Sequence, residues 1–227
     1  MKPPQMTQLD WEQQYRIIPS VYPPINFFEK LVAPEQMETL WYLESLTNER
    51  LLSETGNIRL VDRQDRISGP GASIVMAAFT HNGYPSRFSN GKYGVYYAAK
   101  TRDTAMHETI YHRERFLRYT QEEPGEINMR VYKGKVVKRL HDIRHSGYQP
   151  LHHPDDYGPS QQFAETFHLN KSWGLVYNSV RHTGGECIAI FRPPAVSAPV
   201  QGEHLSYVWN GDKISHVYVK GEMVLMR

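Results

Sequence analysis

Three side chains able to hold a nucleotide follow one another closely in the first half of the chain. Arg87 comes first, Tyr97 stands in an aromatic and apolar run, and Glu108 follows. A guanidinium group binds phosphate oxygens through forked donors, a tyrosine ring packs against a flat base, and a carboxylate accepts hydrogen bonds from sugar hydroxyls. A second polar stretch lies near the other end and reads Tyr177-Asn-Ser-Val-Arg-His-Thr-Gly-Gly185. We interpret the two stretches as halves of one pocket.

Hydrophobic periodicity predicts the elements that carry the first stretch. Residues 93–99 have the apolar, aromatic composition of a buried strand. A helix is expected next, capped by Thr101 or Asp103 and running to about Tyr119. The strand and the helix that carries the carboxylate would then follow each other with little chain between them.

The sides of that helix have different compositions. One stripe consists of Met106, Ile110, Arg113 and Leu117. Glu108 points away from that stripe and shares a side with Ala105 and His112. The carboxylate and the stripe are therefore expected on different sides of the helix.

The rest of the chain predicts a mixed α/β domain, with helices early and strands from the middle onward. Further helices are expected at about 33–46, 72–81 and 160–169, the second of them after the Gly-rich turn 68–71. Further strands are expected at 127–131, 136–140, 188–191 and 205–226, the last folded into a meander by Asn210-Gly211 and Lys220-Gly221. Residues 141–160, rich in His, Pro, Gly and Asp, predict a long loop.

Composition excludes several classes of protein. The chain has 227 residues with 26 basic and 24 acidic side chains, a net charge of +2, which is too balanced for a general nucleic-acid binder. Its single cysteine, Cys187, excludes an internal disulfide, fits a reducing compartment and is interpreted as a small buried hydrophobic residue. We find no signal peptide and no apolar run of the ~18 residues that a membrane span needs. A cytoplasmic protein is expected.

The histidines do not predict a metal site. His107 and His112 are five residues apart, which places them about 140° apart around a helix, so they do not share a face as zinc-protease histidines do. His141, His145, His152 and His153 lie in the predicted loop without the spacing of a ligand set. Phosphate-loop, dinucleotide-fingerprint and Gly-x-Ser-x-Gly motifs are also missing from the sequence.

Several short motifs, in a fixed order, resemble the RES-domain family. They are Ser86-Arg-Phe-Ser-Asn-Gly91, Gly94-Val-Tyr-Tyr-Ala-Ala99, Thr104-Ala-Met-His-Glu108, Val176-Tyr-Asn-Ser-Val-Arg181 and Gly184-Gly185. The resemblance extends over roughly residues 14–195. It implies an ADP-ribosyltransferase-like fold with a central split β-sheet and flanking helices, formed by one domain over 1–227 with a helical insertion at about 32–81.

The resemblance also assigns site residues. The family's two arginines fall on Arg16 and Arg87, its glutamate on Glu108 and its serine on Ser179. Its strand tyrosine falls on Tyr97, with Tyr96 as the competing choice. Arg181 joins Arg16, Arg87, Tyr97 and Ser179 as an expected binding residue. The chain departs from the usual pattern at Phe88, where tryptophan is more usual, at Asn178, where proline is common, and in the long segment between the two arginines.

The implied activity is that of a toxin of a toxin–antitoxin pair, which consumes NAD and is partnered by an Xre-type antitoxin. NAD would be the substrate, and no metal is expected. Glu108 would stabilise the ribose oxocarbenium ion, Arg16 and Arg87 would hold the diphosphate, Tyr97 would contact nicotinamide, and Ser179 would bind its ribose or amide. The acceptor stays open among water, phosphate and a protein side chain.

Two other functions remain open on the sequence. One is an ADP-ribosyltransferase that modifies a specific cellular protein. The other is a non-catalytic nucleotide- or RNA-binding module, although direct nucleic-acid binding is not expected from the charge balance. The oligomeric state is also left open.

Overall fold

The computed structural model describes residues 2–20, 36, 39, 42 and 56–221. Its helices are α3 (Ala72–Thr80), α4 (Arg102–Thr120) and α5 (Gly158–Leu169). Its strands are β1 (Met6–Thr7), β2 (Gln14–Pro19), β3 (Tyr96–Ala99), β4 (Gly125–Gly134), β5 (Leu140–Asp142), β6 (Gly174–Asn178), β7 (Glu186–Ile190), β8 (Val200–Trp209) and β9 (Ile214–Val219). Short 3-10 turns are η1 (Ile58–Leu60), η2 (Arg63–Asp65), η3 (Ser146–His152) and η4 (Pro193–Ala195).

The strands of the described residues join one sheet in the order β1-β5-β6-β7-β3-β2-β4-β8-β9. Every neighbouring pair is antiparallel except β5 and β6, which run parallel. The joint between β2 and β3 is narrow, because it is made by the single pair Tyr15↔Ala99. Beyond that pair the two strands separate, and the sheet is split near its centre. The predicted mixed α/β fold with a split central sheet is confirmed.

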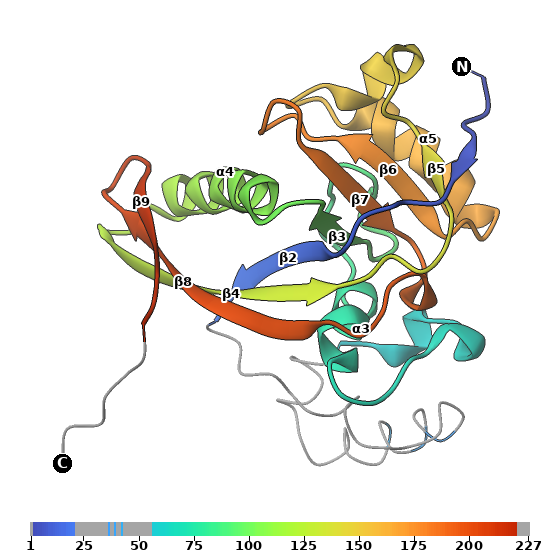
Figure 1. The fold of residues 1–227 in the computed structure, drawn as a ribbon, viewed down its shortest axis with the longest axis horizontal. Coiled ribbons are helices and arrows are strands. Elements are labelled where there is room, and N and C mark those ends of the chain that lie inside the picture. The colour runs from blue at the N-terminus through green and yellow to red at the C-terminus, as the bar shows by residue number, and fades with distance from the viewer. Residues whose placement is uncertain (1, 21–35, 37–38, 40–41, 43–55, 222–227) are drawn as a thin grey trace.

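Helices cover both faces of the sheet. In Figure 1, α4 and α5 lie above the sheet and α3 lies below it. Buried residues form two clusters: one contains Val75, Met76 and Phe79 of α3 with Tyr96 of β3, and the other packs under α4 and α5. Because successive strand side chains point to opposite faces, Tyr96 joins the α3 cluster and its neighbour Tyr97 packs on the α4 side.

Helix α4 begins and ends at identifiable signals. The Thr101 hydroxyl accepts a hydrogen bond from the Thr104 N–H over 3.2 Å, so the predicted cap is Thr101. Gln121 ends the helix in the left-handed region at φ 54°, and its N–H bonds to the last carbonyls. These signals fix which turn of the helix carries Glu108.

Several sequence predictions need correction. The strand predicted at 136–140 is wrong except at its last residue, since Val136 makes only an isolated bridge to Val196 and β5 begins at Leu140. The predicted loop 141–160 contains η3. The strand predicted from residue 93 starts at Tyr96. The predicted helix at 33–46 and much of the insertion at 32–81 lie outside the described residues, and the single-domain interpretation stays a prediction.

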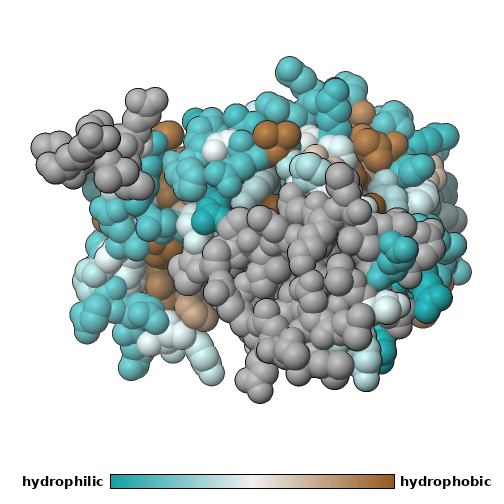
Figure 2. Space-filling view, turned by 90° about the horizontal axis from the view of Figure 1, so that it is seen from below, coloured by the Kyte–Doolittle hydropathy of each residue, from teal (hydrophilic) through white to brown (hydrophobic). Residues whose placement is uncertain are grey.

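The described part of one face of the molecule is mostly hydrophilic. Figure 2, which views the molecule from below, shows hydrophobic residues scattered among larger hydrophilic areas on that face. Within the described ranges no helix combines the length and the apolar character needed to cross a membrane.

Candidate active site

A cavity of about 370 Å³ opens where the sheet splits, between β2 and β3 and beneath α4. This volume is typical of small-molecule sites. Four of the six predicted site residues line it, namely Arg16, Arg87, Tyr97 and Glu108. Ser179 and Arg181 do not line it, but each contacts residues at its edge.

Glu108 projects from α4 and is held through one oxygen. Its Oε1 accepts a hydrogen bond of 2.6 Å from the Ser179 hydroxyl and lies 3.9 Å from the Cys187 Sγ. Within the described part of the chain, its Oε2 accepts no hydrogen bond. The carboxylate therefore has a fixed orientation and one oxygen free to meet a ligand.

Ser179 anchors Glu108 and closes a turn at the same time. Its Oγ accepts hydrogen bonds from the backbone N–H groups of Arg181 (3.1 Å) and His182 (3.0 Å). Its hydroxyl hydrogen is donated to Glu108. Sequence reasoning assigned this hydroxyl to the ribose or amide of nicotinamide. In the structure the hydroxyl donates to the Glu108 carboxylate and orients it.

Arg87 is a buried cation that has no acidic partner among the residues that the structure describes. Its side chain is 8% exposed, and its guanidinium donates to the carbonyls of His153 (2.7 Å) and Pro154 (3.5 Å) and covers the Tyr157 ring at 4.5 Å. No carboxylate among the described residues pairs with it. Because a buried charge is costly without a counter-charge, this guanidinium is suited to an anionic ligand.

Tyr97, rather than Tyr96, belongs to the cavity. Its hydroxyl pairs with the Ser86 hydroxyl over 2.8 Å and accepts from the Phe88 N–H over 3.0 Å, so it holds the residues on both sides of Arg87. Burial raises the pKa of Tyr97 to about 12, which keeps the phenol protonated. Tyr96 lies on the other face, where it accepts a hydrogen bond from Gln14.

A Tyr97→Phe substitution tests this anchoring. We expect the free energy of unfolding to fall by roughly 1–3 kcal/mol, because the buried Phe88 N–H loses its acceptor. Urea denaturation of both proteins measures the difference. The exposed Tyr84 (87% exposed) provides a control, since Tyr84→Phe should leave stability unchanged. Equal stabilities for Tyr97→Phe and wild type would contradict the anchoring role.

Arg16 occupies the split itself. Its Nη1 donates to the carbonyl of Tyr97 over 2.9 Å, and its guanidinium lies 4.5 Å from the centre of the Tyr96 ring. Burial lowers the pKa of Arg16, although an arginine still stays charged. Its Nε is buried and has no hydrogen-bond partner among the described residues. The Arg16 Nε–H group is therefore available to donate a hydrogen bond to a ligand in the cavity.

Arg181 holds the rim of the cavity. Its Nη2 donates to the Pro154 carbonyl and lies 3.5 Å from the Asp155 carboxylate. Its guanidinium stacks on the Tyr111 ring, 3.3 Å from the ring centre, and Tyr111 donates to the same carboxylate over 2.9 Å. These contacts hold the Arg181 guanidinium at the rim through its Nη2.

The cavity wall also includes residues that sequence reasoning did not assign, namely His112, Arg113 and Tyr157. Desolvation lowers the pKa of His112, and nearby arginines lower it further, so its imidazole is neutral at pH 7. The position of His112, four residues after Glu108 on the same helical side, was the available signal. Arg113, expected in the apolar stripe of α4, faces the cavity instead.

Cys187 forms part of the cavity wall behind Glu108. The side chain is 2% exposed, and burial followed by the nearby carboxylate raises the pKa of its thiol well above the ordinary value. The thiol is therefore protonated at neutral pH and is not an activated nucleophile. This agrees with its interpretation as a small buried residue.

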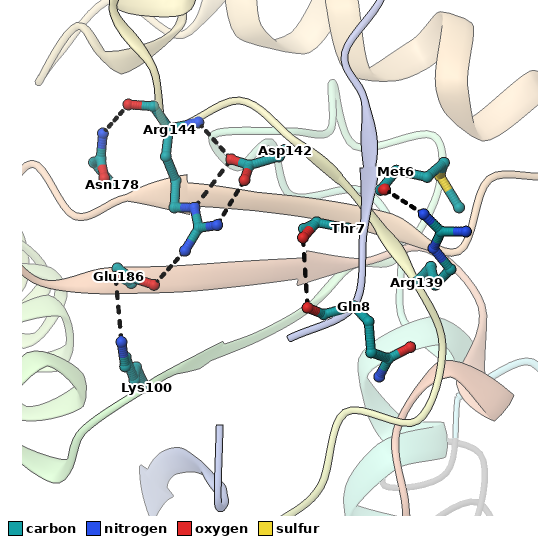
Figure 3. Close-up of polar contacts among 9 residues, drawn as sticks. All are labelled: Met6, Thr7, Gln8, Lys100, Arg139, Asp142, Arg144, Asn178 and Glu186. Atoms are coloured by element: carbon teal, nitrogen blue, oxygen red, sulfur yellow. Dashed lines mark hydrogen bonds and ion pairs between the residues drawn. The ribbon is translucent and has the colours of Figure 1, made fainter. Parts of the chain in front are cut away.

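An ion-pair network links the chain segments next to the site (Figure 3). Arg144 donates two hydrogen bonds to the Asp142 carboxylate (3.0 and 2.6 Å) and one to Glu186 (2.6 Å), and Lys100 reaches the other oxygen of Glu186. Asn178 donates to the Arg144 carbonyl. Three residues of this network stand directly before residues of the site. Lys100 precedes the cap of α4, Asn178 precedes Ser179, and Glu186 precedes Cys187. The network therefore fixes the ends of three elements that form the site.

This network predicts a dependence of stability on pH. Burial raises the pKa of Asp142, but the hydrogen bonds from Arg144 outweigh it and leave the pKa below its ordinary value. The stabilisation is therefore present above the unfolded-state pKa of about 3.9 and is lost as pH falls through the lower folded-state pKa. We expect Asp142→Asn to cost roughly 1–3 kcal/mol at pH 7 and less as the pH approaches 3. Urea denaturation at several pH values measures this, with the exposed Asp212→Asn as control. A cost that does not change with pH would contradict the prediction.

Comparison with known proteins supports the family resemblance that the order of the motifs indicates. The family model described as RES domain matches residues 63–210. The protein y4oC of Sinorhizobium fredii is 30% identical over 210 residues, covering 91% of this chain and 87% of its own. The crystal structure of the Mycobacterium tuberculosis MbcT–MbcA toxin–antitoxin complex contains a chain that aligns at 10% identity and a TM-score of 0.46, with 92% and 87% coverage. The family match covers more than half of the chain, and its residues include Arg87, Tyr97, Glu108 and Ser179. The protein therefore belongs to the RES-domain family.

Proposed function

We propose that this protein cleaves the bond between nicotinamide and ribose in NAD. The observation that carries the proposal is that one cavity contains a fixed carboxylate and a buried guanidinium for which no described residue supplies an acidic partner. NAD offers both complements: an anionic diphosphate for Arg87, and a ribose that becomes cationic during cleavage for Glu108.

The chemistry requires little acid catalysis. As the bond breaks, its electron pair moves to the pyridinium nitrogen and neutral nicotinamide leaves. Positive charge then develops on the ribose, and the Oε2 of Glu108 would stabilise it or accept a hydrogen bond from a ribose hydroxyl. Tyr97 holds the chain on both sides of Arg87, so the guanidinium needs little reorganisation when the diphosphate binds.

Membership of the RES-domain family supports a role as the toxin of a toxin–antitoxin pair. Depletion of NAD would stop growth, and an Xre-type antitoxin would neutralise the protein by blocking the cavity. Co-expression with the product of a neighbouring helix-turn-helix gene tests this part: restored growth is the expected result, and toxicity that persists in a stable complex would contradict it.

The enzymatic proposal is tested by incubating the purified protein with NAD. We expect nicotinamide to be released by the wild type and not by a Glu108→Gln variant. Product analysis with and without phosphate distinguishes water from phosphate as acceptor. Labelled NAD added to a cell extract distinguishes protein modification, because a discrete labelled band would favour the ADP-ribosyltransferase alternative. Binding of NAD without any product would favour a non-catalytic nucleotide-binding module.

A further inference from the structure

We propose that His182 is a positioning residue that aligns the Ser179 turn with helix α4 and so sets the orientation of Glu108. The inference rests on the proposed function and adds to it a pair of residues, His182 and Thr104, that would act through others. Neither residue is among those that line the cavity.

His182 connects the turn to the helix at two points. Its Nδ1 lies 2.9 Å from the Thr104 hydroxyl, and its ring stacks on that of His107, with ring centres 4.5 Å apart and planes 19° apart. Thr104, His107 and Glu108 occupy positions i, i+3 and i+4 of α4 and therefore share one face. The turn 179–185 consequently follows a single face of the helix from its first turn to the carboxylate.

The same residue also shapes the turn. The His182 N–H donates to the Ser179 Oγ over 3.0 Å, and its carbonyl accepts from the Gly185 N–H over 2.9 Å. The hydroxyl that holds Glu108 is thus bonded to the backbone of the residue whose imidazole contacts Thr104. A displacement of His182 from the helix would move the Ser179 hydroxyl away from the carboxylate.

The adjacent glycines explain how the turn can approach the helix so closely. A Cβ on Gly185 would lie 2.7 Å from the Thr104 side chain, which is closer than packing allows, and Gly184 has a φ of 77°. The Thr104 side chain is almost fully buried, and its hydroxyl also lies 2.9 Å from that of Thr101. The close contact between turn and helix is therefore built into both segments.

Isosteric substitution at Thr104 tests the proposal. Thr104→Val removes the hydroxyl and keeps the shape, and we expect it to lower kcat for nicotinamide release by roughly 10- to 100-fold, because Glu108 loses its alignment. Affinity for ADP-ribose should not change, because Arg87 is anchored elsewhere. Thr104→Ser retains the hydroxyl and should stay near the wild-type kcat. On the same helix, Thr120→Val is the matched control.

A second pair of variants examines the imidazole directly. We expect His182→Asn, whose amide can reach Thr104 from a similar position, to keep most of the activity that His182→Ala loses. A loss of ADP-ribose affinity in step with kcat, or equal kcat in Thr104→Ser and Thr104→Val, would overturn the positioning role.

The contact between the turn 179–185 and α4 can also be measured without an activity assay. A failure of the positioning role can then be distinguished from a failure of the proposed function. In a double-mutant cycle of unfolding free energies, Thr104→Val and Ser179→Ala should be non-additive, because both disrupt the same contact between turn and helix. Additive effects would refute the inference, whether or not the wild type cleaves NAD. A wild type that releases no nicotinamide but shows the non-additivity would instead refute the proposed function alone.

Discussion

Glu108→Gln is expected to reduce kcat for nicotinamide release by about 10²- to 10³-fold, the usual cost of removing one preorganised electrostatic group. The amide keeps the size of the side chain and can still accept the Ser179 hydrogen bond through its oxygen. What it loses is the negative charge that faces the developing ribose cation. The substrate's diphosphate is held elsewhere, so KM should change little.

Steady-state assays of nicotinamide release measure this effect. Asp103→Asn, on the exposed first turn of the same helix, is the matched control and should retain wild-type kcat. Ser179→Ala should give an intermediate loss, because it preserves the charge and removes the bond that orients it. Wild-type turnover in Glu108→Gln would eliminate the carboxylate from the chemistry.

Arg87→Met is expected to weaken binding of ADP-ribose by roughly 10- to 100-fold, because a charge-assisted hydrogen bond contributes about 1.5–3 kcal/mol. Methionine keeps an unbranched apolar stem against the Tyr157 ring and removes the guanidinium. The protein should remain folded, since no carboxylate among the described residues loses a partner. Arg192→Met should instead destabilise the protein, because it would leave a buried carboxylate without its cation. Asp65 is 5% exposed and accepts two hydrogen bonds of 2.7 Å from Arg192.

Isothermal titration of ADP-ribose measures the change, and urea denaturation confirms folding. Arg118→Met, at the far end of α4 with a half-exposed side chain, is the control for loss of one positive charge. The two variants should affect different quantities. Arg87→Met should lower the affinity for ADP-ribose, and Glu108→Gln should lower kcat. Unchanged affinity in Arg87→Met would show that the diphosphate does not use this guanidinium.

Much of the local structure was predictable because its causes are local. The run at 93–99 is apolar and aromatic, and Thr101 stands three residues before Thr104, whose N–H it caps. The side of α4 that carries Glu108 follows from helical periodicity alone. The failures also have physical reasons: residues 136–140 look like a strand, but only Leu140 pairs with a strand, as the first residue of β5, and Val136 makes only an isolated bridge.

The spatial arrangement of the site residues depended on contacts between distant parts of the chain. Composition, the order of the motifs and helical periodicity were enough to predict the mixed α/β class, the family resemblance, and the positions of Arg87, Tyr97 and Glu108 along the chain. Only the tertiary structure decided that the Ser179 hydroxyl orients Glu108, that Tyr97 anchors the chain around Arg87, and that the cavity opens where β2 and β3 separate. The physical reason is that periodicity and caps act over a few residues, whereas partners such as Ser179 and Glu108, 71 positions apart, meet only when the strands have paired.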